Sequence, residues 1–289
     1  MNSFLTNKSL SVKTYGEGDT YLIENVFNDK ESTLYFDSLL KDTKWQSMDH
    51  HGGKVPRLIS IQHTNYDDYK PIYRHPVDIH PTDQPWDPTS KVIRDKLHKL
   101  LHVDFNHALI QLYRNGKDCI SEHADKTLDI KFTTPIVNVS FGRTRNMKLR
   151  SKFKLEDGTR KIETIRLTHG SVFILGWKTN TRWTHAIKPD NRSNNIKSPD
   201  ELIFDGQRIS LTMRVIDTFM NKKTNVLIGQ GAPKHPVTIK NENDYVDMIK
   251  VFGIQNRSYD YNWNELYGKG FHSTCSKTEF DTTEHQSES

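Results

Sequence analysis

The stretch Cys119-Ile-Ser-Glu-His-Ala-Asp125 decides how the rest of this 289-residue chain is interpreted. His123 and Asp125 are two positions apart, and in an extended segment residues i and i+2 point to the same side. An imidazole nitrogen and a carboxylate oxygen can then meet at one metal ion. Two ligands do not complete a site, and His185, in Trp183-Thr-His185-Ala-Ile187, is the candidate for the third.

A His-x-Asp pair is a weak signal by itself. The chain has 14 histidines, and chance alone gives about one such pair in a sequence of this composition. A second pair, His102-Val-Asp104, follows apolar residues at helical spacing and is expected at a helix C-terminus. His123 and Asp125 instead follow a predicted strand, and His185 follows another. Two histidines and one carboxylate held at strand ends would leave three positions open on iron(II), as in the facial triad of non-haem oxygenases.

The composition indicates a globular chain that can bury a sizeable core. Hydrophobic residues make up 34% and charged residues 27%, and this length suits one large domain or two small ones. No apolar run approaches the ~20 residues of a membrane span, so no membrane contact is expected. Two distant cysteines and no secretory signal indicate a reducing compartment, the nucleus or the cytoplasm. The net charge of +5 permits nucleic-acid binding without requiring it.

The order of predicted elements is a partly helical N-terminal region followed by a run of strands. Residues 1–20 are expected to be flexible, residues 21–27 to form a strand, and Asn28 and Pro88 to begin helices. The segment 45–88 between the helices reads as irregular, with one strand near 57–61. Six strands are then expected, at 105–113, 135–141, 145–153, 161–167, 171–177 and 208–216. This order predicts a mainly β protein with flanking helices (α+β) and a jelly-roll core.

The segment Arg208-Ile-Ser-Leu-Thr-Met-Arg214 alternates polar and apolar residues. Arg208, Ser210, Thr212 and Arg214 therefore share one face of a strand. One interpretation is an edge strand with a solvated polar face. The other is a pocket for a small dicarboxylate, because the planar fork of an arginine binds a carboxylate through two hydrogen bonds.

Taken in order, these motifs resemble the AlkB family of Fe(II)/2-oxoglutarate dioxygenases. The resemblance covers about residues 20–217, and it is carried by Gln111-Leu-Tyr-Arg-Asn-Gly116, His123-x-Asp125, Pro135-Ile-Val-Asn-Val-Ser-Phe-Gly142, His169-Gly-Ser-Val-Phe-Ile-Leu175, His185 and Arg208-x5-Arg214. The later segments Phe252-Gly-Ile-Gln-Asn-Arg257 and Leu266-Tyr-Gly-Lys-Gly-Phe271 resemble an extension seen in fungal members.

The resemblance implies a double-stranded β-helix that uses Fe(2+), 2-oxoglutarate and O2. Iron would be held by His123, Asp125 and His185. The chain would then divide into a flexible N-terminus (1–20), N-terminal helices with a nucleotide-recognition lid (21–104) and a catalytic core (105–220). A C-terminal extension packed on the core (221–275) and a disordered tail (276–289) would complete it.

The resemblance also implies how 2-oxoglutarate is bound. Arg208 and Tyr113 would hold its distal carboxylate, and Arg214 the carboxylate near the metal. Gln111 and Ser210 stand where the family usually has asparagines. Both are polar, so they are expected to keep the cofactor contacts.

The expected partner is an alkylated nucleic acid, either single-stranded DNA or RNA, whose target base is flipped into the pocket. Arg57 stands where relatives line the nucleotide-binding lid. Tyr73 and His123 are the candidates to receive the base by ring stacking, with plain packing in a loop as the alternative for Tyr73. Basic residues occupy every second position along one predicted strand face, namely Lys148, Arg150, Lys152 and Lys154. They are expected beside phosphates, with a solvated strand face as the alternative.

Two departures from the family favour a single strand over a duplex. Relatives that repair DNA often carry an acid two residues after the metal aspartate, where this chain has Thr127. No aromatic residue suited to invading a duplex stands near Gly52-Gly53. The expected activity is oxidative demethylation of N-alkylated bases by a monomer, with release of formaldehyde, succinate and CO2. The alternatives are an oxygenase for a protein or small molecule, and a binding module without catalysis, which the intact set of motif residues disfavours.

Overall fold

Two sheets form the centre of the protein. The computed structural model describes residues 11–50, 53–76, 81–234 and 242–274. The larger sheet has eight strands in the order β1-β2-β13-β10-β15-β8-β5-β7, namely β1 Val12–Tyr15, β2 Thr20–Ile23, β13 Ser171–Leu175, β10 Ile136–Gly142, β15 Arg208–Arg214, β8 His107–Tyr113, β5 Leu58–His63 and β7 Asp83–Pro85. The smaller sheet has the order β12-β11-β14-β9, from β12 Ile162–Leu167, β11 Arg145–Ser151, β14 Trp183–Ile187 and β9 Ile120–His123.

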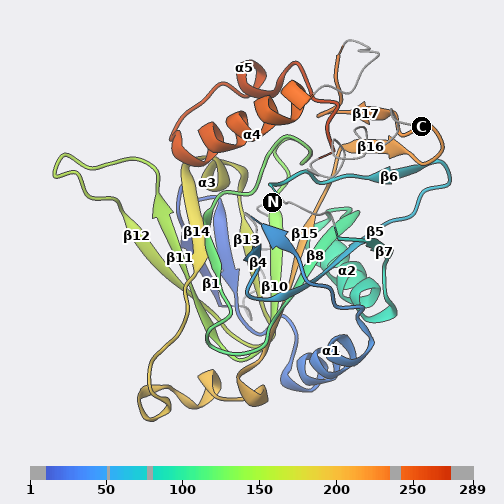
Figure 1. The fold of residues 1–289 in the computed structure, drawn as a ribbon. Coiled ribbons are helices and arrows are strands. Elements are labelled where there is room, and N and C mark those ends of the chain that lie inside the picture. Colours follow the sequence, from blue (N-terminus) through green and yellow to red (C-terminus); the bar gives the residue numbers. More distant parts are fainter. Residues whose placement is uncertain (1–10, 51–52, 77–80, 235–241, 275–289) are drawn as a thin grey trace.

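The path from β8 to β15 makes the jelly roll. The chain runs through β8, β10, β13 and β15 in the larger sheet and β9, β11, β12 and β14 in the smaller one, crossing between the sheets as it goes (Figure 1). This winding is the double-sheet arrangement of a double-stranded β-helix. All six predicted strands are present, although the fifth ends at Leu175 and Trp177 begins the short helix α3 (Trp177–Arg182). The sequence-based prediction missed β9 and β14, the strands that carry His123 and His185.

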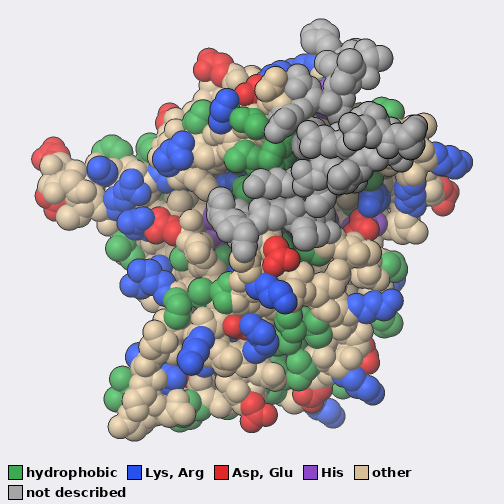
Figure 2. All heavy atoms as spheres, viewed as in Figure 1, with side chains coloured by type: hydrophobic (Ala, Val, Ile, Leu, Met, Phe, Trp, Pro, Cys, Tyr) green, Lys and Arg blue, Asp and Glu red, His purple; other side chains and the backbone are tan. Residues whose placement is uncertain are grey.

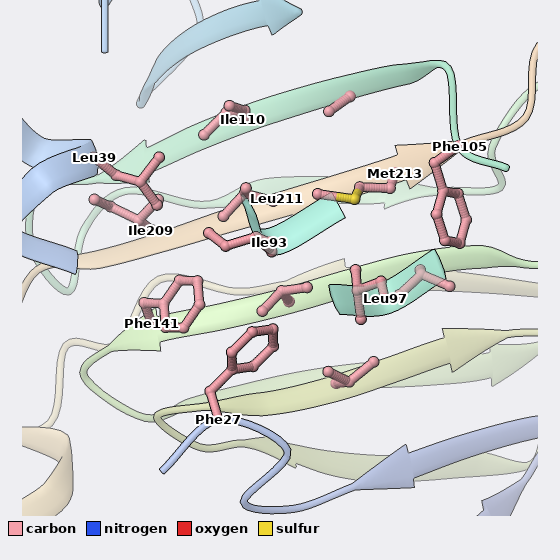
Figure 3. Close-up of a cluster of buried hydrophobic side chains, with 14 of the residues drawn as sticks. Phe27, Leu39, Ile93, Leu97, Phe105, Ile110, Phe141, Ile209, Leu211 and Met213 are labelled. Carbon is pink, nitrogen blue, oxygen red and sulfur yellow. The ribbon is translucent and has the colours of Figure 1, made fainter. Parts of the chain in front are cut away.

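The outer face of the larger sheet is covered by two helices, α1 (Asp29–Asp42) and α2 (Pro88–Leu101). Asn28 caps α1 with a capping box, and Asp87 accepts a hydrogen bond from Ser90 N–H at the start of α2. Figure 3 shows the apolar cluster between these layers, where Ile93 and Leu97 of α2 face residues of β15. The helices cover one face of the central strands, so the opposite face of these strands is left to carry the residues of the site.

The central strands are apolar on one face and polar on the other. In β15, Ile209, Leu211 and Met213 belong to the cluster under the helices, so Arg208, Ser210, Thr212 and Arg214 point toward the smaller sheet. The strand lies between β10 and β8. The edge-strand interpretation is therefore wrong, and this polar face is buried inside the sandwich.

Two expectations for the N-terminal region differ from the structure. Residues 12–15 of the segment expected to be flexible form β1, which pairs with β2; residues 1–10 lie outside the described residues, as do the expected disordered residues 276–289. The segment 45–88, expected to be irregular, contains β5, β7 and three more short strands, β3 Asp49–His50, β4 Gly53–Lys54 and β6 Tyr69–Pro71. Strands of two or three residues show too little alternation to be found by periodicity.

The C-terminal part packs on the open end of the sandwich. After the short 3-10 turns Asn194–Ile196, Pro199–Glu201 and Phe204–Gly206, strands β16 (Thr218–Asn221) and β17 (Leu227–Gly229) form a three-stranded sheet with β6. Helices α4 (Glu242–Arg257) and α5 (Trp263–Tyr267) then lie above α3 in Figure 1. Leu128 packs among Met248, Phe252, Tyr267 and Phe271. None of the helices in the described ranges has the length and apolar character that a membrane crossing requires.

Candidate active site

His123, Asp125 and His185 come together where β14 pairs with β9, at one edge of the smaller sheet. Strands β9 and β14 pair so that His123 lies directly opposite His185, with ring centroids 4.3 Å apart. Oδ1 of Asp125 lies 3.6 Å from Nε2 of His123 and 3.8 Å from Nε2 of His185. One possible ligand atom from each residue lies within 4.8 Å of the others. This is a two-histidine, one-carboxylate cluster on one face, the donor set of the iron(II) facial triad.

Neighbouring groups hold these side chains in the form that binds a metal. The Nδ1 atom of His123 is 2.8 Å from the carbonyl oxygen of Ser121 and donates to it in the tautomer that leaves Nε2 free for a metal. Burial, together with the nearby His123, lowers the pKa of His185 to about 3, so its ring is neutral near pH 7. Burial alone would raise the pKa of Asp125, but the charge of Arg214 and the two histidines hold it well below its usual range. Neutral imidazoles and a carboxylate are the protonation states that metal binding needs.

Arg208 is a buried cation at the opposite end of β15 from Arg214, the arginine that bonds to Asp125. Its side chain is fully buried, and burial lowers its pKa to about 10. Nη2 donates to Ser140 Oγ at 2.8 Å and to Asn138 Oδ1 at 3.2 Å, and the guanidinium lies over the ring of Tyr113. Nε and Nη1 have no hydrogen-bond partner, and no carboxylate pairs with Arg208 among the described residues. A buried charge without a counter-ion is costly, so these free donors suit a carboxylate ligand.

A cavity of about 460 Å³ joins the triad to the protein surface, a size typical of small-molecule sites. It brings together most of the residues that the sequence singled out, and its walls include His123, Asp125, His185, Gln111, Tyr113, Ser210, Arg214, Arg57 and Tyr73. Lys148 and Arg150 do not line it. They lie on β11, where Lys148 is exposed and Arg150 forms a 2.6 Å ion pair with Glu122. Arg208 lies behind the wall, beside Tyr113.

Three residues occupy surroundings that the sequence did not indicate. Lys152 is buried, where it donates to the carbonyl oxygens of Thr181 and Gln255, so its expected contact with phosphate is wrong. Arg57 is also buried and donates to Gln111 Oε1 at 2.6 Å, which makes it part of the cavity wall.

Tyr73 is the third. Its hydroxyl accepts a hydrogen bond from Lys126 N–H. Its ring contacts the guanidinium of Arg214, 4.2 Å from the centroid, and stacks on the ring of His75. The packing alternative therefore describes the contacts that Tyr73 makes in this structure, and stacking on a base stays a prediction.

Several residues of the site were missed in the sequence. Asn138 and Ser140, which hold Arg208, alternate with apolar residues in β10, and that alternation is a signal that was present. Asn180 and Gln255 bond to the main chain of Asp125 from positions 55 and 130 residues away. An amide that bonds to a distant main-chain group leaves no local sequence pattern, so these contacts can be identified only in the folded structure.

The comparisons with known proteins agree with this geometry. The family described as the 2OG-Fe(II) oxygenase superfamily matches residues 19–214, about two thirds of the chain. The chain belongs to this superfamily. Members of this superfamily are oxidoreductases that use Fe(2+), 2-oxoglutarate and O2, and the triad and the free donors of Arg208, within the matched residues, fit these cofactors.

AlkB-like proteins are among the relatives. The chain is 35% identical over 107 residues to the DNA oxidative demethylase ALKBH2 of Bos taurus, covering 36% of this chain and 38% of the relative. It is 26% identical over 195 residues to the alpha-ketoglutarate-dependent dioxygenase alkB homolog 3 of Bos taurus, covering 65% and 62%. It thus covers less than two thirds of either relative. Among solved structures, OsALKBH1 is 14% identical with a TM-score of 0.49, covering 71% of this chain and 99% of that one.

Proposed function

We propose that this protein oxidatively demethylates N-alkylated bases in a single strand of DNA or RNA. The observation that carries the proposal is the cavity that leads from the triad to the surface, in a chain whose relatives are named as DNA oxidative demethylases. The triad lies in its wall beside Arg57 and Tyr73. A flipped base entering this cavity would place its alkyl group near the triad.

His123, Asp125 and His185 would hold iron(II). Arg208 and Tyr113 would bind the distal carboxylate of 2-oxoglutarate, and Arg214 the carboxylate near the metal, with Gln111 and Ser210 lining the space between. In the structure Arg214 already bonds to Asp125, so it would serve both groups. Bound iron and 2-oxoglutarate supply the oxidation that inserts one oxygen atom of O2 into a C–H bond, with succinate and CO2 as co-products. A hydroxylated N-methyl group then breaks down to formaldehyde and the bare base.

The protein's own residues orient the substrate. Arg57 is fixed by Gln111 and by the carbonyl oxygen of Cys119, so it presents a rigid cationic wall to the entering nucleotide. Lys148 and Arg150 would contact the phosphates outside the cavity. Figure 2 shows Lys and Arg side chains gathered around the base of the projecting β11–β12 hairpin. A basic surface beside a deep pocket suits a strand whose backbone stays outside while one base enters.

The second candidate is an oxygenase that acts on a protein or a small molecule. The specific observation in its favour is the pairing of Arg150 with Glu122, which neutralises part of the basic surface. Lys152, being buried, adds nothing to that surface. The same oxidation serves both kinds of substrate, so the fold does not separate them.

The deciding experiment measures formaldehyde and succinate release with three additions: methylated single-stranded DNA, methylated RNA and buffer alone. The proposal expects formaldehyde in equal amount to succinate with at least one oligonucleotide, and none from the Asp125→Ala variant. Succinate without formaldehyde, at the same rate with and without oligonucleotide, would favour the second candidate.

We also propose that the protein acts as a monomer in the nucleus or the cytoplasm. The proposed nucleic-acid substrate and the free thiol of Cys119 support this proposal. Sedimentation at micromolar concentration tests the first part, and a dimer there would contradict it.

A further inference from the structure

The end of helix α4 touches the loop that carries Asp125. Gln255 and Asn256 belong to the C-terminal extension, beyond residue 214, where the family match ends. Nε2 of Gln255 donates to the carbonyl oxygen of Asp125 at 2.7 Å. Oδ1 of Asn256 accepts from Ala124 N–H at 3.1 Å, on the other side of Asp125. Two adjacent side chains of the extension thus bracket one residue of the triad.

Gln255 is fully buried, and both the nitrogen and the oxygen of its side-chain amide are hydrogen-bonded. While its Nε2 donates to Asp125, its Oε1 accepts from the main-chain N–H of Thr127 at 3.1 Å and from the hydroxyl of Tyr267 at 2.5 Å. Tyr267 is in α5 and is itself fully buried. A carbonyl oxygen faces one end of the amide and two donors face the other, so its orientation is fixed, and it ties residues 125 and 127 to both helices of the extension.

The other contacts of Asp125 fix its main chain and one of its two carboxylate oxygens. Its N–H donates to Asn180 Oδ1 at 3.0 Å, and its carbonyl oxygen also accepts from Asn180 Nδ2 at 2.9 Å. Oδ2 of its carboxylate is held by Arg214. With the peptide fixed by Asn180 and Gln255 and one carboxylate oxygen fixed by Arg214, Oδ1 is directed at the two histidines. Outer contacts that orient a ligand commonly change metal affinity by about 10- to 100-fold when they are lost.

We propose that Gln255, with Asn256 beside it, is a positioning residue for the metal site, so that the C-terminal extension sets the orientation of Asp125. The proposal rests on the proposed iron site. Asn256 also lines the cavity and accepts from the Nζ atom of Lys126, so the extension forms part of the substrate wall as well. The protein would therefore bind its metal weakly without α4, even with His123, Asp125 and His185 all present.

The test measures manganese(II) binding by calorimetry, with no nucleic acid and no turnover, in the full-length protein. Gln255→Leu removes the donor to Asp125 and the acceptor for Thr127, and should raise the dissociation constant at least about tenfold. Gln255→Met keeps the length of the side chain but removes both the donor to Asp125 and the acceptor for Thr127 and Tyr267. It should also weaken binding, and it replaces Gln255→Leu if that variant does not fold.

Phe271→Leu is the matched control, because Phe271 is buried in the same extension and its ring packs in the apolar cluster rather than on residues 124–127. It should lower the unfolding temperature while leaving manganese affinity unchanged. Gln255 variants that bind manganese within twofold of the wild type would overturn the proposal. So would an equal loss of affinity in Phe271→Leu at a matched unfolding temperature.

The outcome is separable from that of the proposed function. A wild-type protein that binds manganese through Gln255-dependent contacts but releases no formaldehyde from any oligonucleotide would refute the demethylase and leave the positioning role standing. A wild-type protein that binds no manganese would refute both.

Discussion

Arg214 donates two hydrogen bonds to the same oxygen of Asp125, from Nη2 at 2.6 Å and from Nε at 3.0 Å. Both partners are buried. The arrangement uses Oδ2 of the carboxylate completely and leaves Oδ1 facing His123 and His185. Charge-assisted pairs of this kind are strong and directional, so the carboxylate is fixed before a metal arrives.

The first prediction separates the two His-x-Asp pairs of the chain. His123→Ala and Asp125→Ala should each abolish turnover and weaken iron binding by more than about 100-fold, since the loss of an outer contact alone costs 10- to 100-fold. His102→Ala should change neither, because His102 is the left-handed C-cap of α2 on the opposite side of the larger sheet. Metal analysis of the purified variants decides the matter. Equal loss in His102→Ala would mean that the wrong pair was assigned to the site.

The second prediction concerns Arg208. Arg208→Ala should raise the KM for 2-oxoglutarate at least about tenfold, because a hydrogen bond to a charged group contributes about 1.5–3 kcal/mol. Arg208→Lys should not restore it, since an ammonium lacks the planar fork. Arg166→Ala, at an exposed ion pair with Asp200, is the control and should leave the KM unchanged. An Arg208→Ala enzyme with normal affinity but uncoupled turnover would count against the assignment.

The sequence-based predictions were most accurate where the pattern that supports them is local. Alternation in 208–214 identified the polar face that lines the cavity, and the cap at Asn28 and the proline at Pro88 located both helices. The sequence analysis did not predict strands β9 and β14. These strands have only four and five residues, and they pair with segments far away in the chain. The prediction for Lys152 was also wrong. In a regular strand Lys152 would share the exposed face of Lys148, but Lys152 lies just beyond the end of β11, where the chain turns it under α4.

The third prediction follows from that buried lysine. Burial lowers the pKa of Lys152 to about 7, well below its value in an unfolded chain. Between about pH 7 and 10.5 the unfolded chain therefore binds one more proton at this site than the folded protein does. The free energy of unfolding should then rise with pH, by at most about 1.4 kcal/mol per unit. Below pH 7 both states are protonated and the contribution no longer changes.

Urea unfolding at several pH values, compared between the wild type and Lys152→Met, isolates this contribution. The difference in stability between the two proteins should shift in favour of the wild type as pH rises from 7 to 10. Lys148→Met, at an exposed position, is the control and should show no such trend. A pH-independent difference for Lys152→Met would mean that Lys152 stays charged in the folded protein.

The fourth prediction concerns the ion pair that joins the extension to the core. Arg74 and Asp129 are both fully buried, 2.6 Å apart, and Arg74 also donates to the carbonyl oxygens of Gly231 and Phe271. Asp129→Ala removes the buried carboxylate that accepts several hydrogen bonds from Arg74, and should cost about 3–5 kcal/mol of unfolding free energy. Asp95→Ala breaks the surface pairs that this exposed carboxylate makes with Lys91 and Arg94, and should cost less than about 1 kcal/mol. Similar midpoints for the two variants in urea would show that the buried pair adds little.

The last prediction is that a methylated single strand is demethylated faster than the same lesion in a duplex. Taking a base out of a duplex costs a few kcal/mol, and least for a strand that is already single. Among the described residues, the hairpin β3–β4 contributes Gly53 and Lys54 to the cavity and the next residue is Val55, so none of these is an aromatic wedge. Initial rates at one fixed salt concentration compare the two substrates, and a clear duplex preference would contradict the argument.

The expected phosphate contacts can be tested by measuring how oligonucleotide binding depends on salt concentration. Lys148→Ala should weaken oligonucleotide binding and reduce the slope of log K against log salt by about 0.7, the value for one phosphate contact on a single strand. Lys99→Ala serves as the matched control, because Lys99 is exposed on α2, on the opposite face of the larger sheet. If both variants keep the wild-type slope, the strand does not run along β11. The rate preference would then need a different path for the backbone across the cavity mouth.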